Sequence, residues 1–487
     1  MVLELKTKRR YLAYLCLLFN AYVETCARFG VSIAMIGGMV KVDCNDPTDT
    51  GKFCWSEKTQ AMVLGAYFYG HTVQCLTTYI ANRYTGFTKT YRVWLVVSAV
   101  IQFCYPKLAE VSTSLIIVTQ TIRGILAGIM VAYHFDYIAK FSVGKENKAL
   151  ISIFGANDYI GQGTGGLIAG LVTKSLGWQY YFYLTGAAYI LGLIFNLIFV
   201  NDSPQDSWYL TQQEKDLILK MVHTEDVVIG NPQVTESSPS NAEDPPIECE
   251  ESCEPPSSLK SLICRLYLLA FCIYIPAYNL IYFNLLNVVP FYLNKVLGAD
   301  PLFISSFNVA LSLLIAFCTL AFSCLFQKLD KMLTWFKCRM VFALLPMIIQ
   351  IIVLINLTFM KTLTGVAVNL TLSAIAAATL FSGSVYTINY EIDPKNSAFL
   401  VSVFNSFGQV SGFAGPTLMA AITTTDPDIP NYTAVYKQRW HYFFYTVAGV
   451  AASGFMAIVL AYLIKPDEWV NRDREQRDQK HRTPQQL

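Results

Sequence analysis

The stretch TESSPSNAEDPPIECEESCEPPSS, residues 235–258, divides the chain into two halves. It contains no Lys or Arg and is rich in Pro, Ser and Glu, a composition that buries too little apolar surface to fold. We therefore expect residues 201–260 to form a disordered linker on the cytosolic side. Cys249 and Cys253 lie there without a nearby His or further Cys, so no metal site is predicted.

Apolar segments occur on both sides of that linker, six before it and six after it. Each has about 20 residues, enough to cross roughly 30 Å of hydrocarbon at 1.5 Å per residue. They predict an all-α membrane protein with twelve transmembrane helices in two six-helix bundles, residues 1–200 and 261–465, and a cytosolic tail at 466–487. The segments lie near residues 11–40, 59–80, 93–112, 114–138, 149–172, 178–200, 266–292, 302–326, 338–360, 362–388, 396–423 and 441–464.

The composition agrees with a protein embedded in a lipid bilayer. Of 487 residues, 54% are hydrophobic and 14% are charged, and the mean hydropathy is +0.40, which is too apolar for a soluble chain of this length. The net charge of +2 argues against a nucleic-acid partner. An enzyme is not predicted, because the chain has no HExxH, GxSxG or P-loop pattern.

Lys and Arg residues indicate which loops are cytoplasmic, since short basic loops stay on that side. With both termini cytoplasmic, the inner segments hold 25 of the 36 Lys and Arg residues, the outer loops hold 9, and Arg28 and Arg123 lie within spans. The loop after the first span is then outside, in oxidising space. Cys44 and Cys54 in this loop are candidates for a disulfide. Asn431, in the Asn-Tyr-Thr of another outer loop, is a candidate glycosylation site.

The two arginines within spans are the first candidates for a functional site. A charge at the bilayer centre costs at least about 2.5 to 3.5 kcal/mol, so such residues usually face a cavity or a partner. Arg28 lies in the first span and Arg123 in the fourth. Two guanidinium groups directed at one cavity predict an anion site, because the planar fork of Arg matches a carboxylate or phosphate. The alternative is that Glu24, one helical turn away, simply neutralises Arg28.

Four titratable residues are candidates for proton coupling: Asp158, Glu24, His134 and Asp136. Asp158 lies in the fifth span next to the glycine-rich GQGTGG of residues 161–166, where helices can approach closely. A carboxyl group buried there could carry a proton, although neighbouring amides could instead cap it. His134 and Asp136 are also compatible with solvated positions near the cytoplasmic end of the fourth span.

Eight strings carry a resemblance to a known family: ARFGVSIAMIGGMV, KTQAMVLGAYFYGH, IRGILAG, GWQYYFY, DSPQDSWYLTQQEKDLI, YNLIYFNLLNVVPFYLNKVLG, TINYEIDP and NSFGQVSGFAGP. They resemble the anion/cation symporters of the major facilitator superfamily, which include sialin, the vesicular glutamate transporters and the type I sodium/phosphate cotransporters. The resemblance covers almost the whole chain outside the linker and tails. It is closest to the sialin-like members.

The resemblance implies a monomeric carrier of organic anions whose two halves rock to expose one site to either face of the membrane. It implies that Arg28 and Arg123 bind the anionic group and that Asn405 adds a polar contact from the second half. Tyr278 stands where glutamate-specific vesicular members carry a third arginine, so a dedicated glutamate carrier is not expected. The substrate-binding candidates are Arg28, Arg123, Asn405, His71, Tyr159 and Tyr278.

Two departures from the family pattern bear on ion coupling. Relatives commonly carry a membrane glutamate seven residues after the fourth-span arginine, and here Met130 occupies that place. Proton-coupled bacterial relatives have an acid just before the first-span arginine, where this chain has Ala27. H⁺ and Na⁺ therefore both remain candidate coupling ions.

We predict a secondary transporter that needs no cofactor and moves a small organic anion such as a sialic acid, an acidic amino acid or a related carboxylate. A sodium-coupled carrier of inorganic phosphate or urate is one alternative. A receptor or scaffold that retains the fold without transporting is the other. The segment before the first span lacks an acidic dileucine signal, so we expect the plasma membrane rather than a lysosomal or vesicular membrane.

Overall fold

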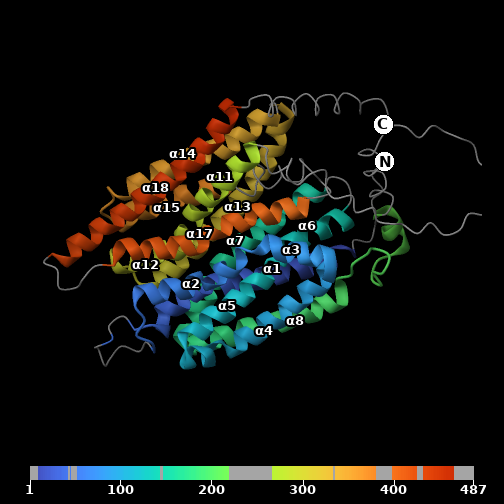
Figure 1. The fold of residues 1–487 in the computed structure, drawn as a ribbon, viewed down its shortest axis with the longest axis horizontal. Coiled ribbons are helices and arrows are strands. Elements are labelled where there is room, and N and C mark those ends of the chain that lie inside the picture. The colour runs from blue at the N-terminus through green and yellow to red at the C-terminus, as the bar shows by residue number, and fades with distance from the viewer. Residues whose placement is uncertain are drawn as a thin grey trace, which may run out of the picture.

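The protein folds into two groups of helices that follow each other along the chain, as the blue-to-green and yellow-to-red ribbons in Figure 1 show. The computed structural model describes residues 9–41, 44, 52–142, 146–218, 266–332, 335–379, 397–424 and 431–464. Regular structure in these residues is helical, apart from one isolated β-bridge between Val40 and Phe53.

The first half contains six spans, several of them interrupted. The first span continues from a regular helix into a wider π-helical turn, the second contains two helices and a π-helical turn, and the fourth breaks at Gly128. Their elements are α1 (Tyr11–Ala34) with η1 (Met35–Met39), α2 (Glu57–His71) with α3 (Gln74–Ile80) and η2 (Ala81–Thr85), α4 (Phe87–Val111), α5 (Thr113–Ala127) with α6 (Ile129–Phe141), α7 (Glu146–Ser175) and α8 (Trp178–Phe199).

The second half repeats this plan. Its first span is also broken by a π-helical turn, which follows directly on Phe283. The elements are α11 (Leu266–Phe283) with η3 (Asn284–Val288) and α12 (Val289–Lys295), α13 (Pro301–Met332), α14 (Trp335–Leu357), α15 (Leu363–Ala377), α17 (Ser397–Thr423) and α18 (Tyr432–Ile464). Among the described residues, six helices are long and apolar enough to cross a membrane. The predicted twelve-helix fold in two bundles is confirmed.

The halves join mainly along two helix pairs: α7 packs along α13, and α2 packs along α17. Glycines allow the close approach. A Cβ atom added to Gly163 of α7 would lie 2.5 Å from the Ser312 Cβ of α13, and one added to Gly412 of α17 would lie 2.1 Å from the Phe68 ring. A glycine at such a position lets a side chain of the neighbouring helix contact the helix backbone directly. The site described below lies between these two contacts.

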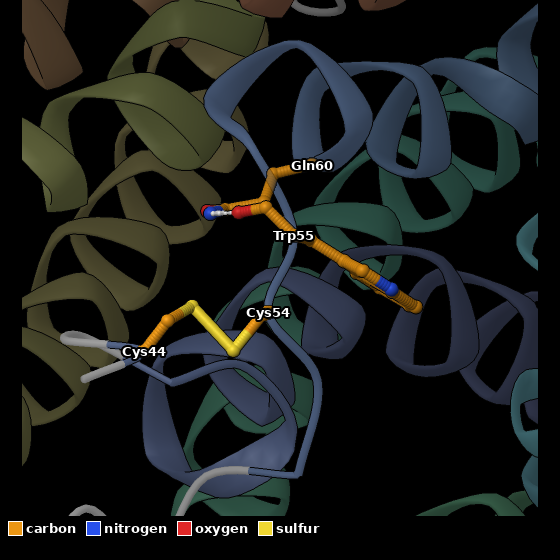
Figure 2. The surroundings of a disulfide bond; sticks show 4 residues. All are labelled: Cys44, Cys54, Trp55 and Gln60. Carbon is orange, nitrogen blue, oxygen red and sulfur yellow. Dashed lines mark hydrogen bonds between the residues drawn. A yellow bond between two sulfur atoms is a disulfide. The ribbon is translucent and has the colours of Figure 1, made fainter. Parts of the chain in front are cut away.

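The loop after the first span contains the disulfide between Cys44 and Cys54 (Figure 2). Their Cα atoms are 5.6 Å apart. Beside it, the Gln60 side chain donates to the Trp55 carbonyl at 2.8 Å, which ties the loop to the first turn of α2. We call this the disulfide end of the bundle. The opposite end holds the junction between α6 and α7.

Part of the predicted linker is folded, which corrects the expectation of disorder over 201–260. Residues 201–218 pack against the first half: Tyr209 is 3% exposed and its hydroxyl lies 3.3 Å from that of Tyr137 on α6, and Ile218 is fully buried. The physical reason is that these residues carry large apolar side chains close together, such as Tyr209 and Leu210, which are scarce in the Pro- and Glu-rich stretch. Residues 219–260 and the tail at 466–487 lie outside the described residues.

Candidate functional site

A cavity of about 80 Å³ lies between the two halves near the middle of the bundle. Helices α1, α2, α6 and α7 line it from the first half, and α11 and α17 from the second. Water occupies about 30 Å³ per molecule and pockets for small ligands typically hold about 300 to 1,000 Å³. The cavity therefore holds a few waters in this conformation and must widen to admit an organic solute.

The cavity extends from the middle of the bundle toward the end that holds the α6–α7 junction. Its α6 wall runs from Met130 to Ile138, and its α7 wall runs from Ile151 to Gln162. Toward the disulfide end it is closed by a cluster of phenylalanines. The Phe283 ring centroid lies 6.1 Å from that of Phe29 and 5.1 Å from that of Phe68. The cluster joins α1, α2 and α11, so it seals one side with residues from both halves.

Arg28 and Asp158 are the charged residues among the described side chains that line the cavity. The Arg28 Nε is buried and has no hydrogen-bond partner among the described residues. Its guanidinium carbon lies 4.5 Å from the Phe29 ring centroid and 5.5 Å from that of Tyr67. Aromatic faces stabilise a cation without using its N–H donors. Arg28 therefore presents a cation with free hydrogen-bonding capacity to the cavity.

Arg123 is placed differently, because it is locked in an internal ion pair. Its Nη2 lies 3.0 Å from Glu24 Oε1, and its Nη1 donates to Gln120 Oε1 at 3.0 Å. The Tyr189 hydroxyl donates to the other oxygen of Glu24. The side chains of Arg123 and Glu24 are 1% and 0% exposed. The pair fastens α5 to α1 and α8, outside the lining of the cavity.

This geometry corrects the expectation that both guanidinium groups line one cavity, and also the alternative that Glu24 neutralises Arg28. Glu24 and Arg28 are one helical turn apart, yet the Glu24 carboxylate turns to α5 because Arg123 and Tyr189 reach it there. Both arginines contact the Tyr67 ring, whose centroid is 5.5 Å from the Arg28 guanidinium carbon and 4.8 Å from that of Arg123. Arg28 lines the cavity and Arg123 does not, so they share this ring without sharing the described lining.

Two histidines from the predicted set line the cavity. His71 stacks on Tyr67, with 5.2 Å between ring centroids, and its Nδ1 lies 3.2 Å from the Gly124 carbonyl oxygen. His134 packs on Phe154 at 4.6 Å, and its Nε2 lies 3.4 Å from the Tyr91 hydroxyl. Both rings are buried and hydrogen-bonded, so they shape the cavity wall beside Arg28 and Asp158.

The other candidates divide between the cavity and its surroundings. Asn405 lines the cavity and joins the halves, since its Nδ2 donates to Gln74 Oε1 at 2.7 Å. The Tyr278 hydroxyl instead donates to the Ala376 carbonyl at 2.8 Å, within the second half. Tyr159 packs behind the lining, with its ring 5.4 Å from that of Tyr282. Asp136 pairs with Lys140 at 2.8 Å, away from the cavity.

The structure adds polar lining residues that sequence reasoning did not select as site residues. Gln162, Tyr282 and Gln409 line the cavity, and the Tyr282 hydroxyl donates to Gln162 across the two halves. Gln409 donates to Asn405 Oδ1 at 3.0 Å. Each follows a selected residue by four positions, namely Asp158, Tyr278 and Asn405. That spacing puts two side chains on one helical face. It could therefore have identified these three residues from the sequence.

Outside the cavity, Asn431 is exposed and precedes α18 with a φ of 64°, a backbone conformation that Asn tolerates. Met130 and Ala27 stand at the two positions where the resemblance led us to expect acids. Met130 is 2% exposed and lines the cavity, so this part of the described wall is apolar. Ala27 is fully buried outside the described lining.

Comparisons with known proteins agree with this architecture. The profile described as Major Facilitator Superfamily matches residues 13–416. Human sialin is 23% identical over 87% of this chain and 79% of its own length. Human sodium-dependent phosphate transport protein 3 is 22% identical over 82% of this chain and 87% of its own.

Among solved structures, a bacterial homolog of the human lysosomal transporter Spinster, in an inward-facing and occupied conformation, has a TM-score of 0.61 at 14% identity. It covers 94% of this chain and 97% of its own. The family match extends over most of the chain, and the helices form two six-span halves around a central cavity. The chain therefore belongs to the Major Facilitator Superfamily, as a multi-pass membrane protein and secondary transporter rather than an enzyme.

Proposed function

We propose that this transporter carries small organic anions, with Arg28 binding the anionic group and the two halves exposing the site alternately to each side of the membrane. The observation that carries the proposal is the position of Arg28: its guanidinium lines the cavity between the halves and has an unused buried N–H. A carboxylate accepts two parallel hydrogen bonds from such a fork. The names of the relatives, which include sialin, support an organic acid as the solute.

The apolar part of the cavity favours a solute with carbon atoms next to its acid group. Met130, Phe135, Phe154 and Phe283 line the space around Arg28 and Asp158. A sialic acid, an acidic amino acid or a related carboxylate could place its acid group on Arg28 and its remaining atoms on these side chains. Asn405 and Gln409, from the second half, supply polar groups for its hydroxyl or amide substituents.

Proton coupling through Asp158 is part of the proposal. Asp158 lines the same cavity as Arg28, while Glu24 and Asp136 are engaged in ion pairs elsewhere. A proton on Asp158 during anion binding would leave Arg28 and the solute as the only opposite charges in the described lining. His134, which also lines the cavity, is the second candidate for this role.

The proposal is tested in liposomes that contain the purified protein. Uptake of radiolabelled N-acetylneuraminate, glutamate, lactate and phosphate is measured for wild type, Arg28→Ala and Arg28→Lys, with the exposed Arg83→Ala as the matched control. We expect at least one carboxylate to be taken up, Arg28→Ala to abolish its uptake and Arg28→Lys to retain part of it, because Lys keeps the charge but not the fork. Wild-type uptake by Arg28→Ala would refute the site.

A sodium-coupled phosphate carrier is the second candidate, favoured by the similarity to sodium-dependent phosphate transport protein 3. Replacing sodium by choline in the same assay separates the two, since phosphate uptake that needs sodium would support this candidate. A receptor that retains the fold would bind a solute without carrying it. Binding with no flux for any compound would favour that alternative. The observation behind it is Met130, an apolar lining residue where the resemblance implies a coupling glutamate.

The remaining parts of the proposal concern placement in the cell. We propose a monomer in the plasma membrane with both ends of the chain in the cytoplasm and the disulfide end outside. Epitope tags at the two ends should be stained only after permeabilisation, and a tag near Asn431 should be stained without it. A monomeric mass in detergent and surface staining in intact cells check the other two points.

A further inference from the structure

The position of Glu24 has a consequence for which solutes the transporter accepts. Two arginines within the first half could supply two cations to one site, but Glu24 holds Arg123 at 3.0 Å and Tyr189 donates to its second oxygen. Both charges of the pair are buried and matched. Among the described residues, the cation that lines the cavity is Arg28.

We propose that Glu24 is a specificity-determining residue that limits the carrier to solutes with a single negative charge. This rests on the proposed function, because it concerns the anion that Arg28 binds. One carboxylate is satisfied by the guanidinium fork of Arg28. A second carboxylate in the same cavity would meet no second cation in the described lining, so its desolvation would not be compensated.

Arg123 is close enough for its charge to matter when Glu24 no longer cancels it. Its guanidinium carbon lies 4.8 Å from the Tyr67 ring centroid, and that ring also contacts Arg28 and His71, which both line the cavity. A carboxylate bound to Arg28 would therefore share the Tyr67 ring as a near neighbour with Arg123. In a buried site of low dielectric a charge acts over such a distance. Removing the carboxylate of Glu24 should give the cavity a second positive charge.

The test uses two compounds of similar shape, glutarate with two negative charges and monomethyl glutarate with one. Uptake into liposomes gives kcat/KM for each compound. The readout is kcat/KM for the monoester divided by kcat/KM for glutarate. We expect the wild type to favour the monoester by at least about tenfold, since an unpaired buried charge costs more than the 1.4 kcal/mol that corresponds to this factor. In Glu24→Gln the ratio should fall about tenfold, through faster glutarate uptake.

A single variant leaves one buried charge unpaired and could misfold, so the double variant Glu24→Gln/Arg123→Gln is measured as well. It removes both charges and keeps the hydrogen-bonding groups, and exchanging a whole buried pair is often tolerated. We expect it to carry monomethyl glutarate within about threefold of wild type and to keep the wild-type ratio, because Arg28 is untouched. Tyr189→Phe removes a hydrogen bond to Glu24 without changing any charge, so its ratio should match wild type.

Each outcome tests either the inference about Glu24 or the proposed function. Loss of uptake of both compounds in the folded double variant would mean that Arg123 itself binds the solute, and would overturn the inference. A wild type that takes up both compounds equally, or an unchanged ratio in Glu24→Gln, would overturn it as well. A wild type that takes up neither glutarate, its monoester nor any other carboxylate would instead refute the proposed function.

Discussion

Lys295 at the end of α12 and Glu57 at the start of α2 form an ion pair across the two halves, with 2.7 Å between Nζ and Oε1. The hydroxyl of Thr424, the residue after α17, lies 3.4 Å from the other oxygen of the same carboxylate. These contacts lie at the disulfide end, where the phenylalanine cluster closes the cavity. They therefore stabilise the conformation that is shut at this end and must break when it opens.

Substituting Lys295 by Ala should make the disulfide end open more often. Exposed ion pairs contribute about 0.2 to 1 kcal/mol, and these side chains are 36% and 26% exposed, so the open fraction should rise by up to about fivefold. A cysteine at Ile36 of η1, in a crevice that α1, η1, α7 and α13 line, should then react faster with a membrane-impermeant thiol reagent. Lys107→Ala is the control, because its pair with Glu110 lies within one half. Equal reaction rates would contradict the prediction.

Asp158→Asn should uncouple transport from the proton gradient. If Asp158 carries the proton, the variant keeps exchange of labelled for unlabelled solute but loses accumulation driven by an inward proton gradient. Asp136→Asn is the matched control, because Asp136 pairs with Lys140 outside the cavity. Both transport modes are measured in the same liposomes. Gradient-driven accumulation by Asp158→Asn at the wild-type level would assign the proton to another residue, with His134 tested next.

Gly124→Ala should severely reduce the yield of folded protein. A Cβ atom at Gly124 would lie 2.0 Å from the Tyr67 carbonyl oxygen, and this atom belongs to the backbone, so α2 and α5 would have to separate. Overpacking a close helix contact costs about 1 to 3 kcal/mol or more. Thermal unfolding in detergent, followed by size-exclusion chromatography, measures the loss. Gly449→Ala should behave as wild type, since a Cβ there meets nothing within 4 Å.

Removing the disulfide should lower the melting temperature without abolishing transport. Cys44 and Cys54 close a loop of sequence separation 10, and closing a loop of this size contributes about 2 to 3 kcal/mol in the chain-entropy account. Cys44→Ser/Cys54→Ser should therefore melt a few degrees lower and no longer respond to reductant. Cys104→Ser, at an exposed free cysteine, is the control. If reductant leaves the melting temperature of the wild type unchanged, the Cys44–Cys54 disulfide does not stabilise the protein and the prediction is wrong.

The sequence alone predicted the fold because its signals are local. Each span is a run of apolar residues long enough to cross a bilayer, and the Pro- and Glu-rich stretch marks the division between the halves. The interruptions η1, η2 and η3 were not predicted, because a π-helical turn depends on how neighbouring helices pack. The packing of residues 201–218 was missed for a similar reason: the few apolar side chains there are informative only once the surface they cover is known.

The site was predicted only in part, since helical spacing describes one helix at a time. Spacing along α1 suggested that Glu24 and Arg28 face each other, whereas the partner of Glu24 is on α5, 99 residues later in the chain. Nothing in one sequence fixes how α1 and α5 are rotated about their axes. Arg28, Asp158 and Asn405 line the cavity, and their roles in binding and coupling are part of the proposal.

The interrupted first spans of the two halves suggest how the outer seal could part. Each leading helix has a wide turn beyond its phenylalanine, η1 after Phe29 and η3 directly after Phe283. Such turns bend more readily than a regular helix. Bending at these turns would move the segments beyond them, including α12 with Lys295, while Phe29 and Phe283 stay on the helices before the turns. The Lys295–Glu57 ion pair would then part before the phenylalanine cluster does, so the two barriers at this end could open one after the other.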